Sequence, residues 1–390
     1  MYQVLTLNRI SPKGLDRLPE SRYAIGDDIA DPDAILVRSA KLHDYEIPVT
    51  LKAVGRAGAG VNNIPVDRMS ARGIPVFNTP GANANAVKEL VILGLILGCR
   101  RILPALEFAR GLSGTDAEIH AAVEAGKKQF VGFELPGRTL GVIGLGAIGR
   151  LVANTGVALG MRVIGFDPGL TVEGAWQLSS SVGKARTLDE LLAASDFVTV
   201  HVPLTEATRH LIDAEKLEAM RPGVVVLNFA RDGIVDDRAV VEAMEAGRVY
   251  AYVTDFPGRA ALAHPRAVAL PHLGASTAEA EENCAVMAAD QIRDFLEDGV
   301  VRNSVNFPEV VVSRGTPHRL ICANANVPNM ISGISDAFGR AGINIHNMAN
   351  MSRGELAYTV VDLDAAVPDE VAAQIGGIDG VLMVRRLPAM

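Results

Sequence analysis

The chain has 390 residues, of which 49% are hydrophobic, and its formal net charge is −8 at pH 7. This length predicts two or three domains, each with its own core, and the acidic balance argues against a nucleic-acid-binding protein. The three cysteines, at positions 99, 284 and 322, are too far apart to indicate a metal motif or a disulfide framework. Because we see neither a signal-peptide pattern nor an apolar run of membrane-spanning length, we expect a cytoplasmic protein.

The first 97 residues alternate short strand and helix patterns, which predicts an α/β domain. Strands are expected at residues 2–7, 34–37, 52–54 and 75–77. Two loops rich in Gly, Asn and Pro, residues 55–63 and 78–85, follow strand patterns. The carboxyl ends of parallel strands are where α/β sheets bind ligands, and Arg38 and Arg56 would add positive charge there. The alternative is a pair of ordinary turns with solvated arginines.

A dinucleotide fingerprint dominates the middle of the chain. After a polar stretch at 109–133, which we expect to cross between domains, residues 139–168 show the pattern strand, turn, helix, strand. Gly144, Gly146 and Gly149 have the G-x-G-x-x-G spacing that admits a pyrophosphate to the amino end of a helix. Asp167 follows the second strand, where a carboxylate accepts ribose hydroxyls and repels a 2′-phosphate. The pattern predicts NAD binding, and the alternative is a structural glycine turn in another α/β protein.

Further apolar strands predict a parallel sheet covered on both faces. They are expected at residues 197–202, 224–229, 251–255 and 268–270. Arg231 and His272 each follow one of these strands, so we expect both at the same edge of the sheet. Histidine exchanges a proton near neutral pH and arginine binds a carboxylate through two hydrogen bonds, which together suit oxidation of a 2-hydroxy acid. The alternatives are a core or capping histidine and a surface ion pair of Arg231 with Asp232 or Asp236.

The last part of the chain begins after a boundary at residues 308–318. A long helix from Ser276, spaced from Glu279 as in a capping box, is expected to lead back to the first domain. Residues 318–390 then show the order β-α-β-β-α-β, typical of a ferredoxin-like domain. The predicted fold class is therefore α/β, with two doubly wound Rossmann-like domains followed by a small βαββαβ domain.

Several motifs together carry a resemblance to a known family. They are Arg38-Ser39, GRAGAGVNN at 55–63, NTPGANAN at 78–85, GLGAIG at 144–149, HVPLT at 201–205, NFARDGIVD at 228–236 and HLGAS at 272–276. In this order, over essentially the whole chain, they resemble the D-2-hydroxyacid dehydrogenases with a C-terminal ACT domain. The resemblance implies a substrate-binding (lid) domain at 1–97 and 283–312, an NAD-binding domain at 98–282 and an ACT regulatory domain at 318–390.

The resemblance also implies a role for each matching residue. Arg231 would orient the substrate carboxylate, and His272 would be the acid/base. The implied NAD contacts are Thr79, Gly144, Gly146, Ala147, Ile148, Gly149, Asp167, Val202, Phe229, Ala230, Asp255, Gly274 and Ala275. The implied substrate contacts are Arg38, Arg56, Gly58, Asn78, Gly81 and Asn83.

The expected ACT domain has its own matching residues. Asn326 and Asn344 match positions that bind an L-serine effector in some relatives, and the alternative is a purely structural or dimerising domain. Asn329 stands where glycine is usual, although asparagine also tolerates a left-handed backbone.

One segment departs from the family. Relatives usually have a glutamate, paired with the catalytic histidine, a few residues beyond the aspartate matched by Asp255. Here no Asp or Glu stands between Asp255 and His272, and Arg259 or Ala260 falls nearest to the expected place. A neighbouring carboxylate raises a histidine's pKa and fixes its tautomer. The sequence therefore leaves the partner of His272 open.

The implied activity is NAD-dependent oxidation of a phosphorylated hydroxy acid, 3-phospho-D-glycerate, to 3-phosphohydroxypyruvate, the entry step to L-serine, by a homodimer or homotetramer. Two alternatives stay open. One is a dehydrogenase or reductase for another 2-hydroxy or 2-keto acid. The other is a non-catalytic NAD-sensing regulator, which the missing glutamate favours and the retained Arg231 and His272 oppose.

Overall fold

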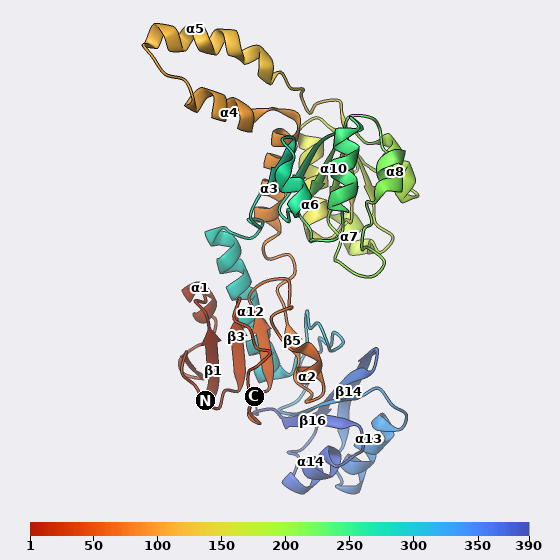
Figure 1. The fold of residues 1–390 in the computed structure, drawn as a ribbon. Coiled ribbons are helices and arrows are strands. Elements are labelled where there is room, and N and C mark those ends of the chain that lie inside the picture. The colour runs from red at the N-terminus through yellow and green to blue at the C-terminus, as the bar shows by residue number, and fades with distance from the viewer. Residues whose placement is uncertain (390) are drawn as a thin grey trace. The chain divides into compact units, whose positions relative to one another are not determined.

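A computed structural model describes residues 1–389. The chain divides into two compact units, which are coloured by residue number in Figure 1. Unit 1 combines residues 1–83 with the chain from Ala278 onward, and unit 2 is Ala84–Thr277. The predicted α/β class with parallel Rossmann-like sheets is confirmed, because each unit contains a parallel sheet covered by helices.

Unit 1 begins with a five-stranded parallel sheet in the order β2-β1-β3-β4-β5. Its strands are β1 (Tyr2–Leu7), β2 (Tyr23–Gly26), β3 (Ala34–Val37), β4 (Ala53–Arg56) and β5 (Val76–Phe77), and its helices are α1 (Pro12–Leu15), α2 (Val66–Ser70) and α12 (Ala278–Asp298). The strand order reverses between β1 and β3, which makes a topological switch point at the carboxyl ends of these strands.

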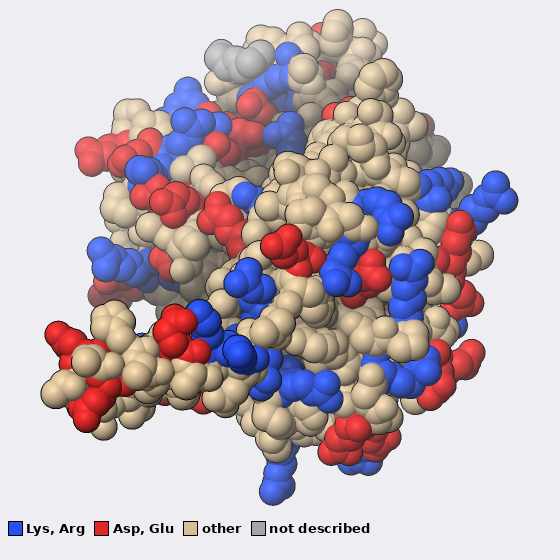
Figure 2. All heavy atoms as spheres, turned by 90° about the horizontal axis from the view of Figure 1, so that it is seen from above, with Lys and Arg blue, Asp and Glu red and all other residues tan. Residues whose placement is uncertain are grey.

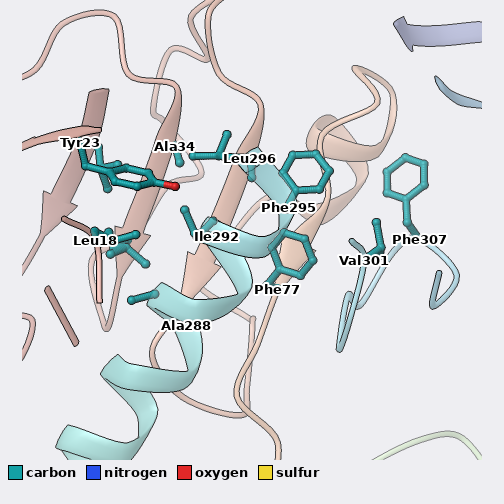
Figure 3. Close-up of a cluster of buried hydrophobic side chains, with 14 of the residues drawn as sticks. Leu18, Tyr23, Ala34, Phe77, Ala288, Ile292, Phe295, Leu296, Val301 and Phe307 are labelled. Atoms are coloured by element: carbon teal, nitrogen blue, oxygen red, sulfur yellow. The ribbon is translucent and has the colours of Figure 1, made fainter. Parts of the chain in front are cut away.

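Helix α12 supplies much of the core of unit 1. Figure 3 shows its residues Ala288, Ile292 and Phe295 directed toward side chains of the sheet, among them Ala34 and Phe77. The buried face of the helix recurs at the three- and four-residue spacing of an amphipathic helix. Helix α12 therefore forms part of the core of unit 1.

The chain from His318 forms a four-stranded antiparallel sheet with two helices. The elements are β13 (His318–Ala325), α13 (Met330–Arg340), β14 (Ile345–Arg353), β15 (Leu356–Leu363), α14 (Asp369–Gly376) and β16 (Val381–Arg386), and the sheet order is β14-β15-β13-β16. Alternate residues of a strand face opposite sides. Accordingly Leu320 and Cys322 pack with the helices, whereas Ile321 and Ala323 join the core that contains α12. The βαββαβ order is as predicted, and its identity as an ACT domain stays a prediction.

Side chains of this terminal part bind the carboxyl end of α12, where a helix leaves carbonyl groups without partners. Arg385 Nη2 donates to the Phe295 carbonyl at 2.6 Å, Arg319 Nη1 to the Asp298 carbonyl at 2.9 Å, and the Tyr358 hydroxyl to the Gly299 carbonyl at 3.0 Å. Arginine charge at this helix end also opposes the negative end of the helix dipole. The terminal part is therefore joined to α12 by hydrogen bonds as well as by shared apolar surface.

A buried ion pair reinforces the same junction. Arg319 Nε and Nη2 donate to the two carboxylate oxygens of Asp362 at 2.6 and 2.9 Å, and the side chains are 0% and 1% exposed. This is the two-pronged geometry that makes arginine–carboxylate pairs strong.

Unit 2 contains a seven-stranded sheet in the order β12-β11-β10-β9-β6-β7-β8. Its strands are β6 (Thr139–Ile143), β7 (Arg162–Phe166), β8 (Val182–Lys184), β9 (Phe197–Val200), β10 (Val224–Asn228), β11 (Val249–Thr254) and β12 (Ala267–Ala269). Its helices are α3 (Ala84–Cys99), α4 (Ile102–Arg110), α5 (Asp116–Gly126), the 3₁₀ helix η1 (Lys127–Phe130), α6 (Ala147–Ala158), α7 (Val172–Trp176), α8 (Leu188–Ala194), α9 (Ala214–Ala219), α10 (Asp237–Glu245) and α11 (Arg259–Ala263). Read from its β8 edge, the sheet has the order β8-β7-β6-β9-β10-β11, which is the strand order of dinucleotide-binding domains.

The units divide at residues 84 and 278, whereas the sequence predicted 98 and 283. The difference at the first boundary has a physical reason in α3. A Cβ on Gly94 would lie 2.8 Å from the Phe229 ring, and one on Gly98 would lie 2.6 Å from Val225. These glycines let α3 approach β10 closely, so α3 belongs to the core of unit 2.

The stretch at 109–133 is largely helical, not the polar crossing that we expected. Helices α4 and α5 form a hairpin that extends from the sheet of unit 2 (Figure 1). Helix α4 buries none of its residues, and it exposes Ile102, Leu103 and Leu106 by 40–43%.

Within residues 1–389, no helix is long and apolar enough to cross a membrane. On the face drawn in Figure 2, basic and acidic side chains are interspersed.

Candidate active site

The glycine-rich turn joins β6 to α6. Gly144 has a φ of 88°, which favours glycine, and a Cβ on Gly149 would overlap the carbonyl oxygen of Gly144. A Cβ on Gly146, in contrast, would meet nothing within 4 Å. Gly146 is also the N-cap of α6, and no side chain caps this helix end. Open space beside free helical N–H groups fits the pyrophosphate of a dinucleotide.

Alanine at these glycines should separate folding from cofactor binding. We expect Gly146→Ala to melt like the wild type but to bind NAD about tenfold more weakly, since its methyl group would stand where the pyrophosphate approaches. Gly149→Ala should lose roughly 3 kcal/mol of stability, because its methyl group collides with backbone. Calorimetric titration with NAD and thermal melting measure the two effects. Unchanged NAD affinity in Gly146→Ala would contradict this placement of the cofactor.

Asp167 lies beside the turn, directly after β7. Its Oδ2 accepts a hydrogen bond from Leu145 N and its Oδ1 accepts one from Gly169 N, both at 2.8 Å. Each carboxylate oxygen has two lone pairs, so each can also accept a hydrogen bond from a ribose hydroxyl. The structure thus brings the predicted ribose-binding carboxylate to the glycine-rich turn.

The residues after β9 form the other wall of the turn. A Cβ on Gly144 would lie 2.8 Å from a methyl group of Val202, so Val202 lies against the glycine. Burial lowers the pKa of His201 to about 3, which keeps its ring neutral. His201 Nε2 lies 3.0 Å from the Thr199 hydroxyl.

Arg231 follows β10 on a turn that Asn228 fixes. Asn228 is buried, its Oδ1 accepts from Ala230 N at 3.1 Å, and its Nδ2 donates to the Arg231 carbonyl at 2.9 Å. The Arg231 guanidinium donates through Nη1 to the Ala230 carbonyl at 2.6 Å. Within residues 1–389 it forms no ion pair with Asp232 or Asp236, so the alternative of a surface ion pair is not observed. The other guanidinium donors suit a substrate carboxylate.

His272 begins the segment that Asp255 anchors. The 1% exposed Asp255 accepts hydrogen bonds from Leu273 N at 2.7 Å and from Gly274 N at 2.9 Å. His272 itself has a φ of 53° and donates its backbone N–H to the Asp255 carbonyl at 3.1 Å. The imidazole is exposed, which does not fit the alternative of a core histidine.

An aromatic ring, not a carboxylate, is the neighbour of the His272 ring. The Phe256 ring centroid lies 4.5 Å from that of the imidazole. Among the described residues, no Asp or Glu oxygen pairs with His272 within 4.0 Å. Asp237 of α10 contacts the loop that precedes His272, since it accepts hydrogen bonds from Gly258 N at 2.5 Å and from the Tyr252 hydroxyl at 3.1 Å. Burial raises the pKa of Asp237.

The predicted substrate residues of unit 1 are linked by hydrogen bonds. Arg56 Nε donates to the Arg38 carbonyl at 3.1 Å, and Arg38 Nη2 pairs with Glu281 at 2.6 Å. Gly58 has a φ of 151° and lies against the Arg56 guanidinium, so a side chain there would collide with it.

The second predicted loop of unit 1 is joined to the first. Asn78 Nδ2 donates to the Ala59 carbonyl at 2.6 Å, and Thr79 N to the Gly58 carbonyl at 3.1 Å. Gly81 has a φ of 81°, and Asn83 ends the segment of unit 1. The Thr79 side chain is fully buried. Its predicted contact with NAD stays a prediction.

The two predicted effector residues lie far apart within one copy of the chain. Asn326 follows the end of β13 that pairs with Leu356, and Asn344 precedes the end of β14 that pairs with Leu363. They therefore lie at opposite ends of β15, separated by roughly 25 Å of strand. Asn329 has the left-handed backbone that its position requires, with a φ of 69°.

Residues 102–274 match the family model described as D-isomer specific 2-hydroxyacid dehydrogenase, NAD binding domain. D-3-phosphoglycerate dehydrogenase of Methanocaldococcus jannaschii is 36% identical over 293 residues, which cover 72% of this chain and 53% of that protein. The same enzyme of Mycobacterium leprae is 35% identical over 346 residues, or 86% and 61% of the two chains. This chain thus spans between 53% and 61% of the length of these two curated relatives.

Solved structures share the fold. NAD⁺-bound 3-phosphoglycerate dehydrogenase of Entamoeba histolytica has a TM-score of 0.60 and 26% identity, over 78% of this chain and 98% of that chain. A glyoxylate reductase from Paecilomyes thermophila has a TM-score of 0.63 and 26% identity over the same shares. The predicted relationship is confirmed: this chain is a relative of D-3-phosphoglycerate dehydrogenases, and its residues 102–274 match the NAD-binding domain of the D-isomer specific 2-hydroxyacid dehydrogenases.

Proposed function

We propose that this chain oxidises 3-phospho-D-glycerate to 3-phosphohydroxypyruvate with NAD, the first step of L-serine biosynthesis. The main support is the placement of Arg231 and His272, which follow strands of a domain whose glycine-rich turn fits a dinucleotide. The similarity to D-3-phosphoglycerate dehydrogenases favours this substrate.

In the proposed reaction, a few side chains have separate roles. Arg231 binds the substrate carboxylate through its guanidinium donors and fixes the orientation of the C2 carbon. His272 removes the proton of the C2 hydroxyl as general base and returns it to water after the ketone has formed. Bound NAD supplies the acceptor for the C2 hydride. The Phe256 ring packs against the His272 ring, where the resemblance leads us to expect a carboxylate.

A panel of acids tests the proposal. We expect the full chain to form NADH with 3-phospho-D-glycerate at a higher kcat/KM than with D-glycerate or 2-hydroxyglutarate, and to prefer NAD to NADP because Asp167 repels a 2′-phosphate. Preference for another acid would support the alternative of a different 2-hydroxyacid dehydrogenase. Binding of NAD without turnover of any acid would support a regulator, the role that the absence of a carboxylate beside His272 favours.

We further propose that the chain works as a homo-oligomer in a reducing compartment such as the cytoplasm. The apolar residues that α4 exposes at Ile102, Leu103 and Leu106 favour contact with a second copy. The three cysteines are free and buried, which suits a reducing compartment. An L-serine site that used both Asn326 and Asn344 would need two copies, because one copy holds them at opposite ends of β15. Adding L-serine to the acid panel tests for such an effect.

A further inference from the structure

No hydrogen bond orients the imidazole of His272 within residues 1–389. The backbone of His272 is fixed, because its N–H donates to the Asp255 carbonyl at 3.1 Å, but its ring forms neither a hydrogen bond nor an ion pair with any described residue. The Phe256 ring packs against it, with the ring centroids 4.5 Å apart and the planes tilted by 50°. Such offset arrangements are the favourable ones for aromatic pairs. The direction of the imidazole therefore depends on where Phe256 stands.

The backbone on either side of the Phe256 ring is held by hydrogen bonds. Phe256 N donates to the hydroxyl of the fully buried Thr254 at 3.0 Å. Two residues further on, Gly258 N donates to Asp237 Oδ2 at 2.5 Å. A Cβ on Gly258 would collide with this oxygen, so the loop approaches Asp237 as closely as only glycine permits. Phe256 thus stands between two points at which the loop is bound to the domain.

Asp237 is itself fixed by core elements of unit 2. It is the first residue of α10, and its Oδ1 accepts a hydrogen bond at 3.1 Å from the hydroxyl of Tyr252, a fully buried residue of β11. Burial raises the pKa of Asp237, so its surroundings favour a neutral group over a charged one. The side chain is therefore placed to accept two hydrogen bonds and to join the loop to α10 and β11.

We propose that Asp237 and Phe256 are positioning residues for the proton acceptor: Asp237 holds the loop, and the Phe256 ring on that loop sets the direction of the His272 imidazole. The inference deepens the proposed function and rests on it for the role of His272. Neither positioning residue needs to touch the substrate. Both act through one contact, the one between the Phe256 and His272 rings, and a small misplacement of a reacting group is enough to slow a reaction.

Phe256→Leu is the direct test, because leucine keeps an apolar side chain and removes the ring. We expect kcat to fall about ten- to hundredfold, with KM for the acid and the affinity for NAD changed less than about threefold. Phe256→Tyr keeps the ring and should stay within about threefold of the wild-type kcat. Phe130→Leu is the matched control, since it removes a ring that lies 5.4 Å from Phe108 in the α4–α5 hairpin. A wild-type kcat in Phe256→Leu would overturn the proposal.

Asp237 is tested with two substitutions. Asp237→Ala removes both acceptors and should lower kcat as much as Phe256→Leu does. Asp237→Asn should retain most of the wild-type kcat, because its amide oxygen can accept from Gly258 N and its amide group can donate to the Tyr252 hydroxyl. Asp116→Ala is the control, since Asp116 is likewise the first residue of a helix and is exposed.

A double-mutant cycle distinguishes one shared contact from two separate effects. If Asp237 acts through the Phe256 ring, Asp237→Ala should cost nothing further in a chain that already carries Phe256→Leu. The kcat of the double variant should then equal that of Phe256→Leu within about threefold. Multiplied losses in the double variant would overturn the coupling between the two residues.

Nuclear magnetic resonance of the full chain, labelled in its histidines, keeps the inference independent of turnover. The signals of the His272 ring are identified by their loss in His272→Asn, and the ring current of Phe256 displaces them. They should move in Phe256→Leu and in Asp237→Ala but not in Asp116→Ala. If the wild type oxidises no acid, the proposed function fails, and these spectra still decide about the contact. Identical His272 signals in the wild type and Asp237→Ala would overturn the proposal.

Discussion

Replacing His272 by asparagine is expected to lower kcat for hydroxy-acid oxidation by about 10²–10⁴-fold, the usual contribution of a general base. Asparagine is the suitable replacement because His272 has a φ of 53°, a backbone conformation that asparagine tolerates better than most residues. NAD affinity should not change, since the backbone bonds from residues 272–274 to Asp255 can persist. Steady-state kinetics and calorimetric titration with NAD measure the two quantities.

His120→Asn serves as the control for this experiment, because His120 lies exposed on α5 and is given no role. Its kcat should equal that of the wild type. If His272→Asn retained more than about a tenth of the wild-type kcat, the proton would have another acceptor, and the role given to His272 would be wrong.

Arg319→Met is expected to destabilise unit 1 by about 3–5 kcal/mol, because it leaves the buried Asp362 carboxylate without its partner. The double variant Arg319→Met with Asp362→Leu should recover part of this loss, since it removes the stranded charge as well. Urea unfolding of the three proteins measures the differences. Arg22→Met is the matched control. It breaks the Arg22–Glu297 pair, whose arginine is 63% exposed, and should cost less than about 1 kcal/mol.

The same pair predicts a dependence on pH. Burial alone would raise the pKa of Asp362, but hydrogen bonds from Arg319 and Gly315 and the nearby arginine charges hold it below its ordinary value. A carboxyl whose pKa is lower in the folded protein stabilises the fold above the pKa that it has when unfolded, about 3.9. This stabilisation is lost as the pH falls through the lowered value. The stability gap between the wild type and the double variant should therefore shrink in acid, and a constant gap would contradict this account.

Local patterns made most of the fold predictable, and one local signal was overlooked. The glycine-rich turn and the apolar strands are short-range features, so the sequence places them well. Helix α5 lies in the stretch that we expected as a polar crossing, because Gly126 alone among its residues is buried. A signal was present nonetheless, since Thr115 and Glu118 form a complete capping box at the start of α5.

The boundary between the units could not be read from the sequence, for a different reason. Periodicity shows that α3 is buried but not which sheet it covers. That choice depends on the close contacts of Gly94 with Phe229 and of Gly98 with Val225, across more than a hundred residues of chain.

The candidate site, too, was only partly predictable from the sequence. The positions of Arg231 and His272 after strands of one parallel sheet were predictable from the sequence, and their roles stay predictions. The supporting residues were not, since Asn228 fixes the Arg231 turn and Phe256 faces the His272 ring through contacts that no spacing rule encodes. Asp255 was expected to bind NAD, whereas both of its oxygens accept hydrogen bonds from backbone of the histidine segment. Its predicted contact with the cofactor stays a prediction.

The attachment of Arg385 and Arg319 to the last carbonyls of α12 has a mechanical consequence. A helix of 21 residues is a rod of about 30 Å, and a rotation of about 5° at one end moves the other by about 2.6 Å. With its carboxyl end fixed, α12 has no slack there to absorb such a rotation. A rotation of the terminal sheet would therefore be carried along α12 to its amino end at Ala278, within unit 1.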